Sequence, residues 1–206
     1  MRKIAHRINS VEQLNHVPIE YGIEVDIRYH ENNLIMHHDP FHHHEEPQPE
    51  HFADFLKFYK HQGPLILNVK TEGVEKECIA LMNSFGIRDW FFLDLSMPFF
   101  AIYAEKALTG ELLGFGPDNL AVRFSERESL EYALGFVGKA GWVWVDCFTV
   151  MPLSEFSYKK LKNNFKICIV SPELQKHSLD RIKEFKEQLS GFKIVRSFND
   201  LNIRVF

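Results

Sequence analysis

Short apolar runs recur along the whole chain, with room for a helix between most neighbouring pairs. The runs have the length of strands and are rich in β-branched and aromatic residues. Most are apolar throughout rather than alternating with polar residues, which is typical of strands buried on both faces of a parallel sheet. The predicted strands comprise residues 4–5, 22–29, 34–37, 64–69, 90–95, 120–124, 142–145, 167–170 and 193–198.

Segments with apolar residues three or four positions apart separate these strands and predict helices. The predicted helices contain residues 11–14, 52–59, 74–82, 130–134, 158–161 and 179–189. Alternation of strand and helix indicates an α/β protein, and about eight strands fit a small (β/α)8 TIM barrel. A doubly wound open sheet is the alternative, but its first turn is usually Gly-rich, and here that turn is Arg7-Ile8-Asn9-Ser10.

The length of the chain limits the number of domains. A chain of 206 residues that is 45% hydrophobic and 25% charged fits one globular domain. We therefore expect residues 1–206 to form a single barrel domain. Because a typical barrel has ~250 residues, its loops should be short and one helix reduced or missing.

Charge and cysteine content exclude several classes of function. The formal net charge is −4, with Lys and Arg spread along the chain, so no nucleic-acid partner is expected. Cys78, Cys147 and Cys168 are odd in number and widely spaced, which indicates buried, reduced thiols. No run approaches the ~20 apolar residues of a transmembrane segment. We expect a cytoplasmic protein, with attachment to a membrane surface left open.

Polar residues gather where the first predicted strands end. His6-Arg7 follows the first strand, and the second carries Glu24 and Asp26, which share a face because they are two residues apart. Two inward carboxylates repel each other unless a cation lies between them, and a hard metal such as Mg or Ca would suit them. Arg7 offers a planar fork for phosphate oxygens.

A short strand after the second one should end at His38-Asp39. Histidines from separate strands near a metal can act as general base and general acid, because imidazole titrates close to neutral pH. His37 precedes His38 directly, but the two side chains of a strand would point to opposite faces.

In order and approximate spacing, His6-Arg7, Glu24-Val25-Asp26 and His38-Asp39 resemble the signature of glycerophosphodiester phosphodiesterases. These enzymes form (β/α)8 barrels in the group that includes phosphatidylinositol-specific phospholipases C, and they act in lipid metabolism. The resemblance implies a phosphoric diester hydrolase in which His6 and His38 do the acid/base work. It also implies that Glu24 and Asp26 bind a divalent metal and that a neighbouring substrate hydroxyl can be the first nucleophile.

The sequence departs from this pattern in the run Leu65–Lys70. Asn68 stands where the family carries a further metal-binding Glu, while Lys70 is retained. An Asn carbonyl oxygen can bind a hard cation but adds no charge, so we expect Glu24, Asp26 and Asn68 to bind metal more weakly than the usual set. The glycine that commonly follows His-Arg is Ile8 here, which indicates a divergent member.

Later strands end at further candidates for the rim of the site. Lys70 and Arg123 are predicted to contact the substrate, whereas Arg123 and Asp146 could equally form a structural charge network. The additional candidates at strand ends are Asp94, Ser125 and Glu126.

Three functions are compatible with these residues. The first is metal-dependent hydrolysis of a glycerophosphodiester-like small molecule by histidine acid/base catalysis. The second is a barrel that binds phosphate esters without turnover, which the loss of a carboxylate at Asn68 favours. The third is a lyase related to phospholipase C that releases a cyclic phosphate. The sequence does not determine the oligomeric state.

Overall fold

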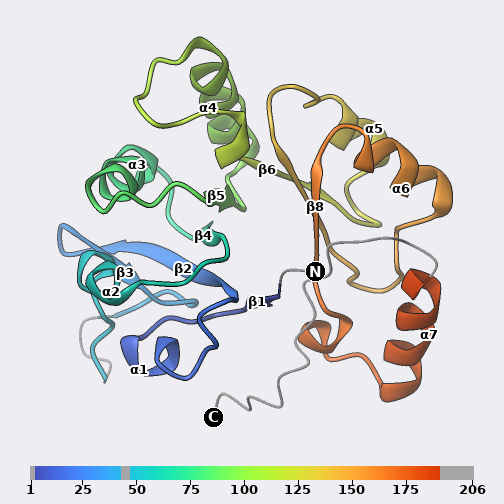
Figure 1. The fold of residues 1–206 in the computed structure, drawn as a ribbon, viewed down its shortest axis with the longest axis horizontal. Helices are drawn as coiled ribbons and strands as arrows, with labels where there is room; N and C mark the ends of the chain where they lie inside the picture. Colours follow the sequence, from blue (N-terminus) through green and yellow to red (C-terminus); the bar gives the residue numbers. More distant parts are fainter. Residues whose placement is uncertain (1–2, 43–46, 191–206) are drawn as a thin grey trace.

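The computed structural model describes residues 3–42 and 47–190. Figure 1 shows helices around the outside with the strands between them. The strands are β1 (Ile4–Ala5), β2 (Gly22–His30), β3 (Asn33–Met36), β4 (Leu65–Val69), β5 (Trp90–Leu93), β6 (Ala121–Phe124), β7 (Trp142–Val145) and β8 (Lys166–Ile169). The helices are α1 (Val11–Leu14), α2 (Phe52–Phe58), α3 (Glu75–Ser84), α4 (Met97–Thr109), α5 (Leu130–Leu134), α6 (Glu155–Lys162) and α7 (Leu179–Ser190), with 3-10 turns at Pro117–Asn119 and Pro172–Gln175.

The strands follow the chain order of a barrel. β1, β2, β4 and β5 pair in parallel in that order, and β6, β7 and β8 form a second parallel path. A parallel bridge between Phe92 and Leu120 joins the two paths. Side chains from both paths meet in one buried cluster, Ile4, Ile66, Phe91, Leu93, Ala121, Trp142, Trp144, Cys168 and Val170. Both paths therefore enclose one interior, as in a (β/α) barrel.

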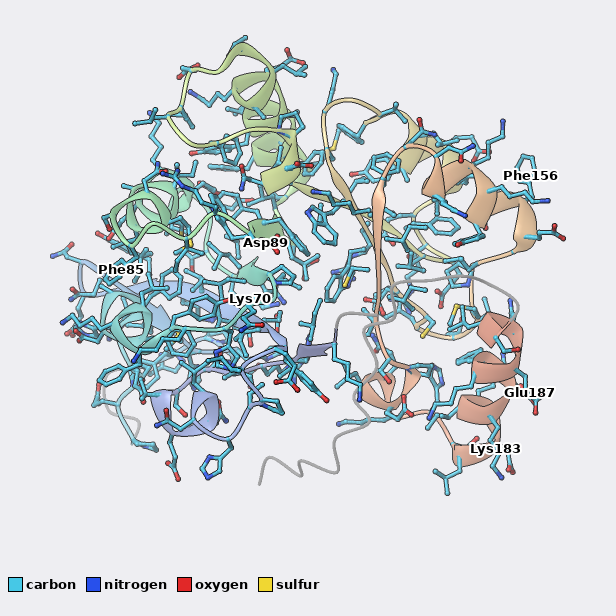
Figure 2. The ribbon with its side chains drawn as sticks, in the orientation of Figure 1. Lys70, Phe85, Asp89, Phe156, Lys183 and Glu187 are labelled. Carbon is cyan, nitrogen blue, oxygen red and sulfur yellow. The ribbon has the colours of Figure 1, made fainter. Side chains whose placement is uncertain are left out.

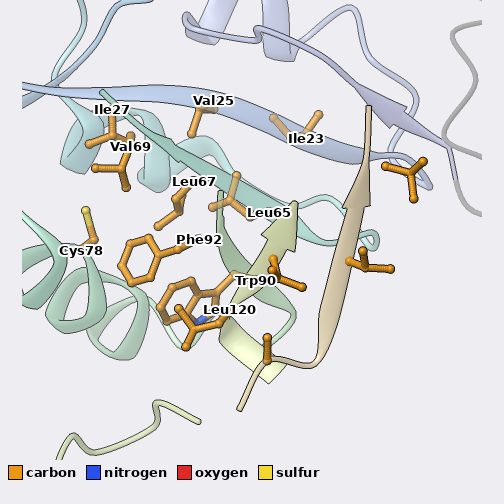
Figure 3. Close-up of a cluster of buried hydrophobic side chains, with 14 of the residues drawn as sticks. Ile23, Val25, Ile27, Leu65, Leu67, Val69, Cys78, Trp90, Phe92 and Leu120 are labelled. Carbon is orange, nitrogen blue, oxygen red and sulfur yellow. The ribbon is translucent and has the colours of Figure 1, made fainter. Parts of the chain in front are cut away.

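Alternation along the strands separates this interior from the layer under the helices. Figure 3 shows Val25, Leu67 and Phe92 of three neighbouring strands in a common apolar cluster with Cys78 of α3. Because successive side chains of a strand point to opposite faces, the residues between them point into the barrel. Ile66 is one such inward residue of β4. On the neighbouring strand β2, Glu24 and Asp26 are the inward residues with polar side chains.

One part of the strand prediction is wrong, and another part falls outside the described residues. β3 pairs antiparallel with β2 and ends at Met36, so it is a hairpin arm and not a barrel strand. His38-Asp39 consequently lies in the loop after β3, and not at the end of a strand as predicted. The strand predicted at residues 193–198 lies outside the described residues.

The prediction of buried, reduced cysteines holds. Cys78, Cys147 and Cys168 are all free and buried. No helix within residues 3–42 and 47–190 is long and apolar enough to cross a membrane.

Helix α3 begins with a carboxylate that the core encloses completely. Glu75 is 0% exposed, and its Oε2 has no hydrogen-bond partner among the described residues. Burial raises the pKa of the Glu75 carboxyl, because the charged form loses water. The folded protein therefore holds this proton more tightly than the unfolded chain, and ionisation of Glu75 costs stability as the pH rises.

We expect Glu75→Gln to raise the free energy of unfolding at neutral pH by about 1 kcal/mol, because the amide is not charged. The gain should vanish below the ordinary pKa of 4.5, where Glu75 is protonated in both states. Urea unfolding at a series of pH values measures both quantities. Glu77→Gln, at an exposed position of the same helical turn, should show no comparable gain.

Candidate active site

Glu24 lies at the centre of the polar cluster and is fully buried. Its Oε2 accepts a hydrogen bond from the backbone N–H of Arg7 at 2.7 Å and lies 3.2 Å from Nδ1 of His6. Its Oε1 accepts a hydrogen bond from Nδ2 of Asn68 at 2.8 Å. Asn68 lies in β4, and His6 and Arg7 are the two residues that follow β1, so the pairing of β2 with β1 and β4 brings all three close to Glu24.

Asp26 is also fully buried, and Asn9 holds its orientation. Asn9 Nδ2 donates to Oδ2 of Asp26 at 2.9 Å, while Asn9 Oδ1 accepts from the Asp26 backbone N–H at 2.8 Å. The other oxygen, Oδ1, lies 3.5 Å from Nζ of Lys70 and has no hydrogen-bond partner among the described residues. Asn9 is a site residue that the sequence analysis missed. The available signal was an Asn in the turn directly after His-Arg, one residue before the Ser10 cap of α1.

We expect Asn9→Ala to lower the free energy of unfolding by about 2 kcal/mol or more, because it removes two hydrogen bonds to Asp26 and leaves a buried carboxylate oxygen without a donor. Chemical denaturation measures the change. Asn15→Ala, at the exposed end of α1, is the matched control and should be close to neutral.

Arg7 connects the two predicted histidine motifs. Its backbone is left-handed, with φ of 57°, so its N–H faces Glu24 while its side chain reaches His38. Arg7 Nη2 lies 2.8 Å from His38 Nε2, and a guanidinium can only donate, so Nε2 accepts and Nδ1 carries the proton. Nδ1 then donates to Oδ1 of Asp39 at 2.8 Å. This hydrogen bond lowers the pKa of the Asp39 carboxyl below its ordinary value.

His6 is partly buried and lies between Glu24 and an aromatic wall. Its ring stacks on Trp144 with centroids 6.5 Å apart and planes 25° apart. A histidine whose Nδ1 faces a carboxylate keeps its proton there, which leaves the Nε2 lone pair available for a proton. Each histidine therefore has a carboxylate on its Nδ1 side.

The opposite side of the site is a charge network around Arg123. Its guanidinium forms ion pairs with Asp94 and Asp146, the latter at 3.1 Å. Burial alone would lower the pKa of Arg123, but the two carboxylates raise it above its ordinary value. Lys70 Nζ lies 3.7 Å from Asp94, and Gln175 Nε2 donates to Asp146 at 2.6 Å. Arg123 and Asp146 thus form a charge network, which is one of the two roles predicted for them. Both also line the cavity that contains His6 and His38.

The remaining two candidates stabilise loops. Ser125 Oγ donates to the Glu128 carboxylate. Glu126 accepts hydrogen bonds from the backbone N–H groups of Phe148 and Thr149. Neither residue lines the cavity that contains His6 and His38.

A cavity of about 710 Å³ brings most of the predicted residues together. Lys70, labelled in Figure 2, follows β4 directly and lines this cavity. Glu24 and Asp26 lie behind this lining, fully buried. Its lining includes His6, Arg7, Asn9, His38, Asn68, Lys70, Asp94, Arg123, Trp144, Asp146 and Gln175. The size is within the range of small-molecule sites.

Buried oxygen atoms that accept no hydrogen bond from the described residues mark where a cation could bind. Asp26 and Asn68 are register partners on adjacent strands, and the Oδ1 atoms of both are buried without a hydrogen bond among the described residues. With Glu24 they make two carboxylates and one amide, a donor set that fits a hard cation. Within the described ranges, no group of three or more His, Cys, Asp or Glu side chains could hold a metal. Because Asn68 is neutral, the set of Glu24, Asp26 and Asn68 has only two negative charges.

No protein-family model and no curated protein matches this sequence. Two solved structures are similar to it across the chain. A glycerophosphodiester phosphodiesterase from Agrobacterium tumefaciens shares 12% identity, with a TM-score of 0.66 and 96% of both chains covered. A glycerophosphoryl diester phosphodiesterase from Parabacteroides distasonis also shares 12% identity, with a TM-score of 0.64, 95% of this chain and 81% of that chain covered. The chain therefore has the fold of the glycerophosphodiester phosphodiesterases.

Proposed function

We propose that this chain is a metal-assisted phosphoric diester hydrolase that acts on a glycerophosphodiester-like small molecule. One observation carries the proposal: His6, His38, Arg7 and Lys70 line a single cavity in front of the buried Glu24–Asp26 pair. Hydrolysis of a phosphodiester requires groups that transfer protons and groups that offset negative charge. Two imidazoles and two cations in one concave site supply both. The neighbours in fold are named as phosphodiesterases of this class.

The cations of the chain hold the phosphate in the proposed mechanism. Arg7 offers a bidentate fork and Lys70 a point charge to the phosphate oxygens, and both offset the negative charge that grows in the transition state. To bind phosphate with both arms, Arg7 must give up its hydrogen bond to His38. That exchange would free the His38 Nε2 lone pair next to the bound substrate.

The histidines move the protons. One takes the proton of the attacking hydroxyl or water, and the other gives a proton to the leaving alcohol. Glu24 beside His6 and Asp39 beside His38 stabilise the imidazolium that each ring becomes in turn. Glu24, Asp26 and Asn68 would hold a divalent cation, Mg or Ca, which would supply positive charge beside the phosphate oxygens.

Binding without turnover is the second candidate, because the Asn68 amide already satisfies one oxygen of Glu24. Phosphorus NMR of the wild-type protein with glycerophosphodiesters, with Mg or Ca and then with EDTA, separates the possibilities. Release of a phosphomonoester that EDTA abolishes and metal restores supports the hydrolase. A persistent cyclic phosphate would instead indicate a lyase. Chemical-shift changes on binding, without any product, would indicate a binding protein.

A further inference from the structure

Arg28 of β2 is a charged residue beside the site that the proposed mechanism does not use. It lies two positions beyond Asp26, so its side chain leaves the strand on the same face. The side chain is partly buried, and no carboxylate among the described residues forms an ion pair with its guanidinium. Because a charge away from water is costly without partners, the N–H donors of Arg28 must be satisfied in another way.

These donors go to the main chain of two site residues. Nη2 donates to the carbonyl oxygen of His38 at 2.9 Å, and Nε donates to the same oxygen at 3.3 Å. Nη1 donates to the carbonyl oxygen of Lys70 at 3.4 Å. His38 lies in the loop after β3, and Lys70 follows β4. One side chain of β2 thus joins segments from the strands on both of its sides.

The contact with His38 is the stronger of the two. A donor–acceptor distance of 2.9 Å is that of an ordinary hydrogen bond, whereas 3.4 Å is longer than most. Lys70 is also held by its own backbone N–H, which donates to a carbonyl oxygen of β2 at 2.8 Å. The N–H of His37, just before His38, donates to another β2 carbonyl oxygen at 3.1 Å. Arg28 therefore adds the attachment on the far side of His38.

We propose that Arg28 is a positioning residue that sets the place of the His38 ring in the catalytic cavity. This inference rests on the proposed phosphodiester hydrolase and deepens it by adding a residue on which proton transfer depends. Asp39 and Arg7 hold the two ring nitrogens, and Arg28 holds the main chain from which the ring projects. When Arg7 turns to the phosphate, Asp39 and Arg28 continue to hold His38. Arg28 itself does not line the cavity.

Arg28→Met is expected to lower kcat for bis(p-nitrophenyl) phosphate about 10- to 100-fold, with KM within about twofold of the wild-type value. The rate falls because the His38 ring is no longer held in place, whereas Arg7 and Lys70 still bind the phosphate. Arg28→Lys keeps the positive charge but lacks the planar fork, so its kcat should stay low as well. Steady-state kinetics separates kcat from KM.

Nitrogen NMR of the histidine rings tests the same inference without turnover. In the wild type, His38 should give the signals of a ring protonated at Nδ1, assigned by their loss in His38→Ala. Arg28→Met should broaden or average these signals and leave those of His6 unchanged. Arg88→Met is the matched control for both measurements, because Arg88 is exposed and lies outside the cavity lining. It should alter neither the rate nor the signals.

The outcomes that would overturn the inference differ from those that would overturn the proposed function. Unchanged His38 signals or a wild-type kcat in folded Arg28→Met would overturn the positioning role, and the hydrolase would still stand. Recovery of the wild-type rate in Arg28→Lys, or an equal loss in Arg88→Met, would overturn it too. If the wild-type protein hydrolyses no diester, the proposed function fails, and the His38 signals still decide whether Arg28 positions the ring.

Discussion

Replacing either His6 or His38 by alanine is expected to slow hydrolysis of a generic phosphodiester such as bis(p-nitrophenyl) phosphate by about 10²- to 10⁴-fold. The physical reason is the position of both rings. Each lines the cavity and has a carboxylate on its Nδ1 side, so each can exchange a proton with the substrate through Nε2. Initial rates at saturating metal and several pH values measure the effect.

His16→Ala is the matched control for these two variants. His16 is exposed and lies outside the cavity lining, and its ring Nδ1 is 2.8 Å from the Glu12 carbonyl oxygen. Its loss should leave the rate unchanged. Circular dichroism must show that the His6 and His38 variants are folded. Wild-type rates in folded variants would refute the assignment of acid/base roles to these histidines.

Asn68→Glu is expected to tighten binding of Ca or Mg at least about tenfold, since affinity at oxygen sites rises with the number of ligand charges. The same change removes the amide that donates to Glu24 and adds a third carboxylate to a buried site. Without metal, the variant should therefore lose about 1–3 kcal/mol of stability. Calorimetry measures the affinity, and thermal unfolding with and without Ca measures the linkage.

The opposite change is Glu24→Gln, which leaves one carboxylate and should abolish measurable metal binding. Asn164→Glu, at an exposed position after α6, adds the same charge as Asn68→Glu away from the site and serves as its control. Equal metal affinity in wild type and Asn68→Glu would exclude Asn68 from the metal site. Unchanged affinity in Glu24→Gln would place the metal elsewhere.

Features that depend on local pattern follow from the sequence. The alternation in β2 directs Ile23, Val25 and Ile27 to the helices and Glu24 and Asp26 to the interior, because a strand has a period of two. His6 follows Ile4 on the same face by the same rule. The parallel register then brings Asn68 beside Asp26. These residues could be predicted because the polar positions of β2 lie two residues apart and therefore share one face of the strand.

Contacts made by loops and by distant strands depend on the tertiary structure. His38 reaches Arg7 from a loop after an antiparallel hairpin arm, a geometry that no periodicity specifies. Asn9 binds Asp26 across a turn, and Arg123 meets Asp94 from the neighbouring path of strands. Such contacts depend on the closure of the barrel, which is set by packing throughout the interior and not by any one segment.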